Sequence, residues 1–128
     1  MVEITEEKNG RKPRIFHVSN RETLLKLRDD ILRLHGFEVD STLYSQCSPD
    51  QVAKGEYDLV LIDVEGENRV GQAIQLCNDI KEFSPGQQVA YVCNYRVAIE
   101  SDCPDEVIRA EFNPEALVRS VQQALPGR

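Results

Sequence analysis

The eight-residue run from Tyr57 to Val64 constrains the fold more than any other part of the sequence. Its centre, Leu59 to Ile62, consists of four consecutive aliphatic residues. Such a run leaves no polar face, so it is typical of a strand that is buried on both sides in the middle of a parallel sheet. The apolar stretch ends at Asp63. Ligands of parallel α/β sheets bind beyond the carboxyl ends of the strands, and Asp63 is therefore a candidate site residue.

The rest of the chain alternates short apolar runs with segments of helical period, which is typical of repeated strand–helix units around a parallel sheet. Strands are predicted at residues 15–18, 37–39, 57–64, 89–93 and 106–112. Helices are predicted at residues 24–34, 48–55, 70–80, 95–100 and 113–125. This order predicts a (βα)₅ α/β fold, in which a doubly wound, parallel five-stranded sheet lies between two layers of helices.

Two of the predicted helices carry apolar stripes at helical spacing, which predict the faces that pack on the sheet. The stripe of the first helix consists of Leu24, Leu27, Ile31 and Leu34, widened by Leu25 and Leu32. The stripe of the third helix consists of Val70, Ile74, Cys77 and Ile80. Gly36 predicts the end of the first helix, because glycine is free to adopt a positive φ.

The balance of charges disfavours two classes of partner. The chain of 128 residues has 15 basic and 22 acidic side chains, which makes a formal net charge of −7. Nucleic-acid binders and membrane-surface binders both use a basic surface, so we expect no nucleic acid and no membrane among the partners. No run approaches the ~20 apolar residues of a membrane span, and the polar start is unlike a secretory signal. We therefore expect a cytoplasmic protein.

The predicted organisation is a flexible polar lead-in at residues 1–13 and one domain at residues 14–126. The chain has four widely spaced cysteines with no Cys-x-x-Cys pair: Cys47, Cys77, Cys93 and Cys103. Cytosolic proteins keep such thiols reduced, so all four are predicted to be free. Cys103 and Arg109 have the spacing of cysteine phosphatases, but the acidic residues between them would repel phosphate. We reject that site.

Two histidines and one cysteine have competing interpretations. His17 lies inside the first predicted strand, where a hydrogen-bonded core histidine is favoured over a phosphohistidine or a metal ligand. His35 is expected to support the carboxyl end of the first helix, where a cation is favourable. Cys93 ends the fourth predicted strand, and a buried, inert thiol is favoured there over a redox-sensitive one.

From about Arg14 to Leu125, the chain resembles the receiver domain of two-component response regulators. The segment Asp58-Leu59-Val60-Leu61-Ile62-Asp63-Val64 is similar to the phosphoacceptor strand of that family, with Asp63 in the phosphorylated place. Gly71 and the segment 112–117 are similar to the starts of its third and last helices. The resemblance implies a flavodoxin-like sheet of strand order 2-1-3-4-5. It also implies a role in phosphorelay signal transduction, with a histidine kinase or an output protein as partner.

The sequence departs from the family at each position that assists the phosphoacceptor. The acidic pair that binds Mg²⁺ is replaced by Ser19 and Asn20, and the hydroxyl residue by Cys93. The switch aromatic is replaced by Ile108 and the lysine by Ala110. From Cys93 to Ala110 is 17 positions, about one helical turn shorter than is usual in the family. The fourth helix is therefore expected to be cropped, and the oligomeric state stays open.

These replacements predict a degenerate receiver, or pseudo-receiver, that acts through protein contacts with little or no phosphoryl switching. It would not be an enzyme beyond weak self-phosphorylation or dephosphorylation at Asp63. It would need no cofactor, because one carboxylate and one amide bind Mg²⁺ weakly. One alternative keeps Asp63 as a phosphoacceptor with a substitute metal site of Asn20, Asp63 and Glu65. Arg21 or Arg109 would then supply the missing cation. A second alternative is a flavodoxin-like module that binds FMN or a nucleotide through the loop at residues 19–23.

Overall fold

The computed structural model describes residues 11–93, 97–109 and 113–125. They form one parallel sheet of strand order β2-β1-β3-β4-β5, which confirms the predicted fold class. The strands are β1 (Arg14–Ser19), β2 (Glu38–Leu43), β3 (Leu59–Asp63), β4 (Val89–Cys93) and β5 (Glu106–Arg109). The helices are α1 (Glu22–Leu34), α2 (Pro49–Gly55), α3 (Val70–Phe83) and α4 (Pro114–Ala124), with short 3₁₀ turns at Tyr44–Gln46 and Glu67–Arg69.

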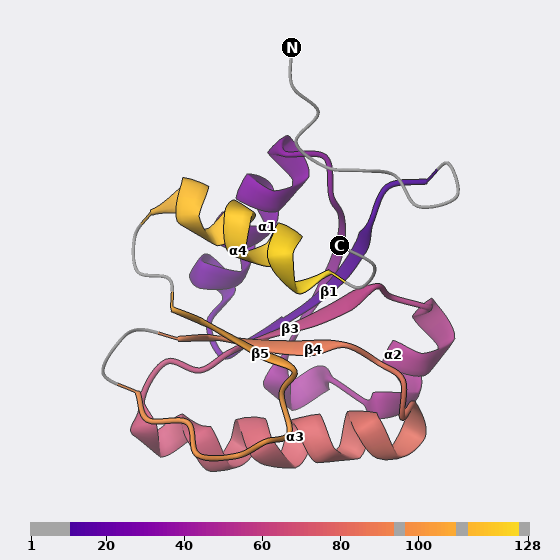
Figure 1. Ribbon diagram of the computed structural model, residues 1–128, viewed down its shortest axis with the longest axis vertical. Coiled ribbons are helices and arrows are strands. Elements are labelled where there is room, and N and C mark those ends of the chain that lie inside the picture. The colour runs from indigo at the N-terminus through magenta and orange to yellow at the C-terminus, as the bar shows by residue number, and fades with distance from the viewer. Residues whose placement is uncertain (1–10, 94–96, 110–112, 126–128) are drawn as a thin grey trace.

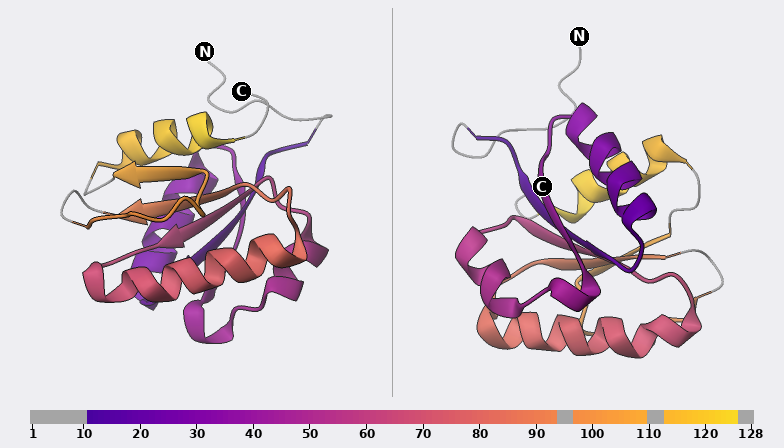
Figure 2. Two further views of the ribbon diagram at one scale, coloured as in Figure 1. Left: turned by 60° about the horizontal axis from the view of Figure 1, so that its bottom comes forward. Right: turned by 180° about the vertical axis from the view of Figure 1, so that it is seen from behind.

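The sheet is the middle layer of three (Figure 1). Helices α1 and α4 lie on one side of it and α2 and α3 on the other, as two further views confirm (Figure 2). Side chains of β3 alternate between the two sides: Leu59 and Leu61 pack with α4, whereas Val60 and Ile62 pack with α3. Every residue of β3 is buried, as expected for a central strand that helices cover on both faces.

The ends of several helices follow from local chemistry. Gly36 has a φ of 93° directly beyond α1, which confirms its predicted role. His35 is the residue that ends α1, and its Nδ1 lies 2.9 Å from the backbone oxygen of Ile31. Ser48 and Gln51 form a reciprocal capping box at the start of α2. Such caps satisfy backbone groups that have no partner inside the helix.

The orientation of α1 differs from the prediction. Leu32 is fully buried, but Leu27 and Leu34 are 56% and 84% exposed. The face that meets the sheet includes Arg28, whose side chain is only 12% exposed, and the buried Asp29. The predicted stripe is therefore wrong for Leu27 and Leu34, whereas Leu32 is buried and Leu24, Leu25 and Ile31 are partly buried. In α3 the prediction holds better, because Cys77 and Ile80 are fully buried.

The connection between β4 and β5 contains no helix in its described part, residues 97–105. The short helix predicted at residues 95–100 begins outside the described residues, and its remainder, from Val97, is not helical. The last strand ends at Arg109, and its predicted continuation at residues 110–112 also lies outside them. Most of the predicted lead-in lies outside as well, although the Arg11 side chain forms a 3.0 Å ion pair with Asp58.

A disulfide joins Cys77 of α3 to Cys103 of the β4–β5 connection. The prediction of four free thiols is wrong for this pair and right for Cys47 and Cys93. The 26 residues that separate the two cysteines in the sequence gave no sign that their Cα atoms lie 6.3 Å apart. The bond also removes the Cys103 sulfur from any phosphatase-like chemistry. In the described part of the chain, no helix is long and apolar enough to cross a membrane.

Candidate functional site

Asp63 is the last residue of β3, at the carboxyl edge of the sheet. Its side chain is 1% exposed, so its carboxylate is out of contact with bulk water. The side chain points to the side of the sheet that α1 covers, where it meets Arg28. A buried carboxylate needs charged or hydrogen-bonding partners, because the free energy of an isolated buried charge is unfavourable by several kcal/mol or more.

His17 of β1 lies between two carboxylates. Its Nε2 is 3.0 Å from Asp63 Oδ2, and its Nδ1 is 2.8 Å from Asp29 Oδ1. Carboxylates accept hydrogen bonds and do not donate them, so both ring nitrogens donate and the ring is an imidazolium. Burial lowers the pKa of His17, but the charges and hydrogen bonds of Asp63 and Asp29 outweigh it and raise that pKa from 6.5 to about 9. The predicted hydrogen-bonded core histidine is confirmed.

The other oxygen of Asp63 is bound by a second cation. Arg28 of α1 donates from Nη1 to Asp63 Oδ1. Burial by itself raises the pKa of Asp63. The opposing effects are larger: the pKa is lowered by the positive charges of His17 and Arg28 and by hydrogen bonds from His17 and Ser19, so that the net shift is downward. The carboxylate is thus ionised, with a cation at each oxygen.

These four side chains, His17, Arg28, Asp29 and Asp63, are called the buried ion cluster below. Two positive and two negative charges make it neutral. His17 and Asp29 are separated by 12 residues in sequence, Arg28 and Asp63 by 35, and His17 and Asp63 by 46. A neutral, hydrogen-bonded group of this kind can be buried, whereas the same group without one member has an uncompensated charge.

The register of the strands and the rotation of α1 create the cluster. His17 is paired with Leu61 across the β1–β3 ladder, and alternation places the Asp63 side chain on the same face as Leu61. Arg28 and Asp29 come from the turn of α1 that crosses that face. Asp63 and His17 could be identified from the sequence, whereas Arg28 and Asp29 were not predicted. The available signal was the histidine itself, because a buried imidazole inside an apolar strand requires polar partners from a neighbouring element.

Of the other predicted site residues, Ser19 contacts the cluster through a hydrogen bond to Asp63, whereas Asn20 and Glu65 lie near it. Ser19 is fully buried at the end of β1, and its Oγ accepts from the backbone N–H of Arg21 at 3.3 Å. The Nδ2 of Asn20 is buried with no hydrogen-bond partner within the described chain. The Glu65 carboxylate is 2.8 Å from Nε of Arg21, so these two residues bind each other.

The residues at the positions of the switch hydroxyl and the switch aromatic are both buried. Cys93 is buried, and its Sγ lies 3.4 Å from Nη1 of Arg109. Burial raises the pKa of the Cys93 thiol more than Arg109 and Arg28 lower it. Ile108 is buried in the core on the α1 and α4 side. Ala110 lies outside the described residues.

The residues around Asp63 do not fit a magnesium ion. Mg²⁺ requires near-octahedral oxygen ligands and is attracted by uncompensated carboxylates. Both oxygens of Asp63 already bind cationic groups, and Arg28 would repel a divalent cation. The nearby Glu65 carboxylate is paired with Arg21. Among the described residues, no group of three His, Cys, Asp or Glu side chains is placed to hold a metal.

No model of a known protein family matches the chain, and no curated protein sequence matches it significantly. Many solved structures do match. The chemotaxis response regulator CheY4 of Vibrio cholerae aligns with 89% of this chain and 99% of its own, at 14% identity and a TM-score of 0.73. The response regulator TrrA of Thermotoga maritima, in complex with Mg²⁺ and BeF, aligns with 88% and 99%, at 23% identity and a TM-score of 0.67.

A CheY-like receiver domain of Methanospirillum hungatei aligns with 88% of this chain and 92% of its own, at 21% identity and a TM-score of 0.66. The alignments span nearly the whole length of each of these proteins. The TM-scores of these alignments establish the fold, whereas identities this low do not establish the chemistry of the site. The chain has the fold of the CheY-like receiver domains of response regulators.

Proposed function

We propose that this chain is a pseudo-receiver: a cytoplasmic signalling domain of a phosphorelay that acts through protein contacts without a phosphoryl switch and without enzymatic activity. One observation carries the proposal. Each oxygen of Asp63, the residue in the phosphoacceptor place, is bound by a cation that belongs to the protein itself.

Phosphorylation of an aspartate requires a carboxylate oxygen to attack phosphorus while cations stabilise the charge on the transferring group. In this chain the carboxylate would first have to leave His17 and Arg28. Its lowered pKa makes it a weaker base and a weaker nucleophile. Such a departure would also leave the buried ion cluster with one uncompensated positive charge, because Asp29 alone would remain to balance His17 and Arg28, and this is unfavourable by several kcal/mol. The contacts of Asp63 thus support a structural role for this carboxylate.

A role in protein contacts has two supports. The receiver TrrA has been solved in complex with the histidine kinase ThkA, and it aligns with 88% of this chain at a TM-score of 0.63. Helix α1 exposes Leu27 and Leu34, two turns apart on one side of the helix. Exposed apolar side chains that gather on one surface are more common at protein interfaces than elsewhere. We propose a histidine kinase or an output protein as the partner.

The deciding experiment is incubation of the protein with acetyl phosphate and Mg²⁺, followed by intact mass measurement. We expect no added phosphoryl group over minutes. The matched control is Asp63→Asn, which cannot form the acyl phosphate. Stoichiometric phosphorylation of the unmodified protein, absent from Asp63→Asn, would overturn the proposal.

A second measurement separates the alternatives. The retained phosphoacceptor with a substitute metal site requires that Mg²⁺ stabilise the protein through Asp63 and Glu65. We expect millimolar Mg²⁺ to leave the melting temperature unchanged, because both carboxylates are already paired. A rise that disappears in Asp63→Asn would favour that alternative, and a rise with FMN or a nucleotide would favour the flavodoxin-like module.

A further inference from the structure

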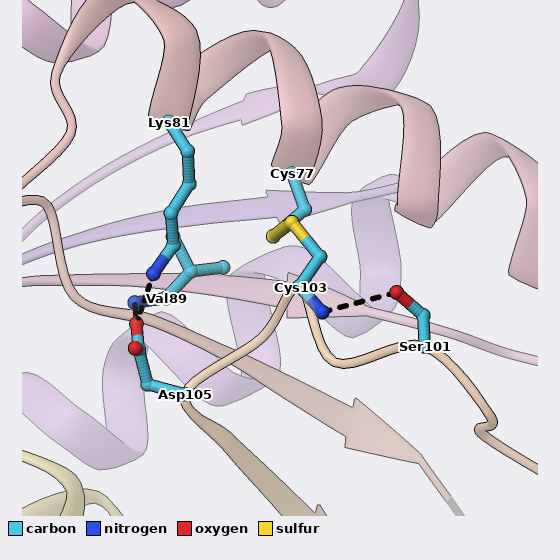
Figure 3. The surroundings of a disulfide bond; sticks show 6 residues. All are labelled: Cys77, Lys81, Val89, Ser101, Cys103 and Asp105. Carbon is cyan, nitrogen blue, oxygen red and sulfur yellow. Dashed lines mark hydrogen bonds and ion pairs between the residues drawn. A yellow bond between two sulfur atoms is a disulfide. The ribbon is translucent and has the colours of Figure 1, made fainter.

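The Cys77–Cys103 disulfide lies apart from the buried ion cluster, on the other side of the sheet. Cys77 is fully buried on the inner face of α3, and Cys103 lies at the end of the β4–β5 connection, just before β5 (Figure 3). The Cys103 residue is partly exposed. The bond therefore joins a core helix to a surface segment and has one partner that solvent can reach.

The segment that the bond holds is called the covering segment, residues 97–105. It has no helix or strand of its own. Val97 is 3% exposed, and Ile99 and Cys103 are partly buried against the apolar cluster of α2, α3 and β4. The covering segment thus shields part of this cluster from water without the backbone ladder that holds a strand in place.

Both ends of the covering segment have anchors that do not depend on the disulfide. At one end, Asp105 Oδ2 accepts from the backbone N–H of Val89 at 2.8 Å and from Lys81 Nζ at 2.7 Å (Figure 3). The backbone N–H of Asp105 also donates to the oxygen of Val89 at 2.8 Å. At the other end, Arg109 donates from Nη1 to the backbone oxygen of Val97.

The part between those anchors is held differently. Ser101 Oγ accepts from the backbone N–H of Cys103 at 3.0 Å, which is a contact within the segment (Figure 3). The disulfide is the covalent link from this part to α3. Without this link, residues 98–104 would keep only the packing of Ile99 and Cys103 and the anchors at the two ends, while β5 remains paired with β4 through the register from Ala90 to Cys93.

We propose that the Cys77–Cys103 pair is a reversible redox switch that fastens the covering segment to α3 when oxidised and releases it when reduced. The inference rests on the proposed function in one respect, which is the cytoplasmic location. Disulfides in that compartment are usually transient or redox-sensing, because cellular dithiols reduce them. A bond with one partly exposed partner, in a domain that keeps two other thiols reduced, fits that class.

The reaction is thiol–disulfide exchange with a dithiol reductant of the thioredoxin class. A thiolate of the reductant attacks Sγ of Cys103, the partly exposed partner, and the bond to Cys77 breaks. The electron pair of that bond leaves with the Cys77 sulfur, which takes up a proton. The second thiol of the reductant then displaces Cys103, so that the protein gains two thiols and the reductant becomes a disulfide.

The first test counts thiols in the denatured protein, after equilibration with either glutathione disulfide or a thioredoxin system. We expect two alkylatable thiols in the oxidised protein and four in the reduced one, since Cys47 and Cys93 are free in both. Four thiols after oxidation, or two after treatment with the thioredoxin system, would overturn the proposal.

The second test follows amide hydrogen exchange of the native protein in both states. We expect exchange of residues 98–104 to become about tenfold faster or more upon reduction, because local opening loses its covalent restraint. Peptides from β1 and β3 should not change. Equal exchange of residues 98–104 in the two states would overturn the switch, and so would loss of protection throughout the chain, which would make the bond a structural staple.

Two matched variants test whether the effect of reductant comes from the disulfide. Cys103→Ser should exchange as the reduced protein does and should not respond to reductant. Cys47→Ser, which removes a free thiol, should behave as the unmodified protein. A Cys103→Ser variant with the slow exchange of the oxidised protein would contradict the proposal. None of these readouts involves Asp63, so a phosphorylated Asp63 would overturn the proposed function and leave the thiol and exchange results unaffected.

Discussion

Helices α1 and α3 cover opposite faces of the same sheet, and the surfaces that they bury differ: that of α3 is apolar, whereas that of α1 combines Leu32 with charged side chains. Helix α3 buries Ala73, Cys77 and Ile80, which is the ordinary apolar face of an amphipathic helix. Helix α1 buries Asp29 and most of Arg28 and leaves Leu34 84% exposed. The apolar pattern therefore predicted the buried face of α3 but only part of that of α1, where Leu27 and Leu34 are exposed.

The difference comes from what each helix meets on the sheet. Helix α3 meets a surface of apolar side chains, so burying its own apolar face is the most favourable choice. Helix α1 meets His17 and Asp63, whose charges require partners. Burying a leucine is favourable by about 1.5–3 kcal/mol, whereas an unpaired buried charge is unfavourable by several kcal/mol. Charge pairing consequently outweighs the burial of Leu27 and Leu34, and it sets the rotation of α1.

The largest expected effect is the loss of one member of the buried ion cluster. Asp63→Asn removes the negative charge between His17 and Arg28 and should lower the free energy of unfolding by about 4 kcal/mol. Urea denaturation measures it. The control is Glu65→Gln, which breaks a pair whose arginine is 64% exposed and should change stability by at most about 1 kcal/mol. A similar decrease in the free energy of unfolding in the two variants would mean that the cluster stabilises the fold no more than an exposed ion pair does.

The two leucines near the end of α1 test the rotation of the helix directly. Leu32→Ala should lower the free energy of unfolding by about 3.5 kcal/mol, because Leu32 is fully buried and its truncation leaves a cavity. Leu34→Ala should change it by less than about 0.5 kcal/mol, because Leu34 is exposed. Both variants keep helix propensity high. Equal destabilisation in urea would show that the predicted stripe faces the sheet after all.

The cluster should make stability depend on pH on the alkaline side. The pKa of His17 is raised to about 9 in the folded protein, against 6.5 when unfolded. The stabilisation from its charge is fully present below pH 6.5 and is lost as the pH rises through about 9, a decrease of about 3 kcal/mol. Unfolding followed by circular dichroism between pH 6 and 10 measures it. His17→Gln should flatten this part of the profile, and an unchanged slope in that variant would assign the effect to other groups.

The cluster should also make stability depend on pH on the acid side, where stability is lost as the pH falls. The pKa of Asp63 is lowered in the folded protein, so its contribution is present above the unfolded pKa of about 3.8 and is lost as the pH falls. We expect stability to be greatest between about pH 4 and 6.5 on account of these two groups. In Asp63→Asn the acid branch should be shallower, and the same denaturation series continued to pH 2.5 checks it.

Among the variants expected to lower stability, the smallest effect is expected for the loss of the disulfide on the α3 side. Cys103→Ser should lower the free energy of unfolding by about 2–3 kcal/mol, because the cross-link restricts the unfolded chain. The protein should remain folded, since its apolar clusters and the contacts of Asp105 with Val89 and Lys81 are retained. Thermal unfolding with and without reductant measures the effect. Reductant should not alter Cys103→Ser, and a reductant effect in that variant would point to Cys47 or Cys93.

Much of the fold could be predicted because its signals are local. The apolar run of β3 and the caps of α1 and α2 depend on residues within one or two turns of each other. Less of the site could be predicted. Asp63 was identified from its place at the end of β3, and His17 as a hydrogen-bonded core histidine. Its partners Arg28 and Asp29 were missed, because a helical period describes which residues share a face and leaves open which face is buried.

The sequence by itself determined the α/β class, the parallel central strand and the position of the carboxylate at its end. Only the tertiary structure decided which side of α1 turns inward, which cations bind Asp63, and that Cys77 and Cys103 are joined. The physical reason is the separation in sequence over which each kind of interaction acts. Backbone preferences and apolar periodicity act between neighbours in the chain, whereas the buried charges and the disulfide connect residues 12 to 46 positions apart.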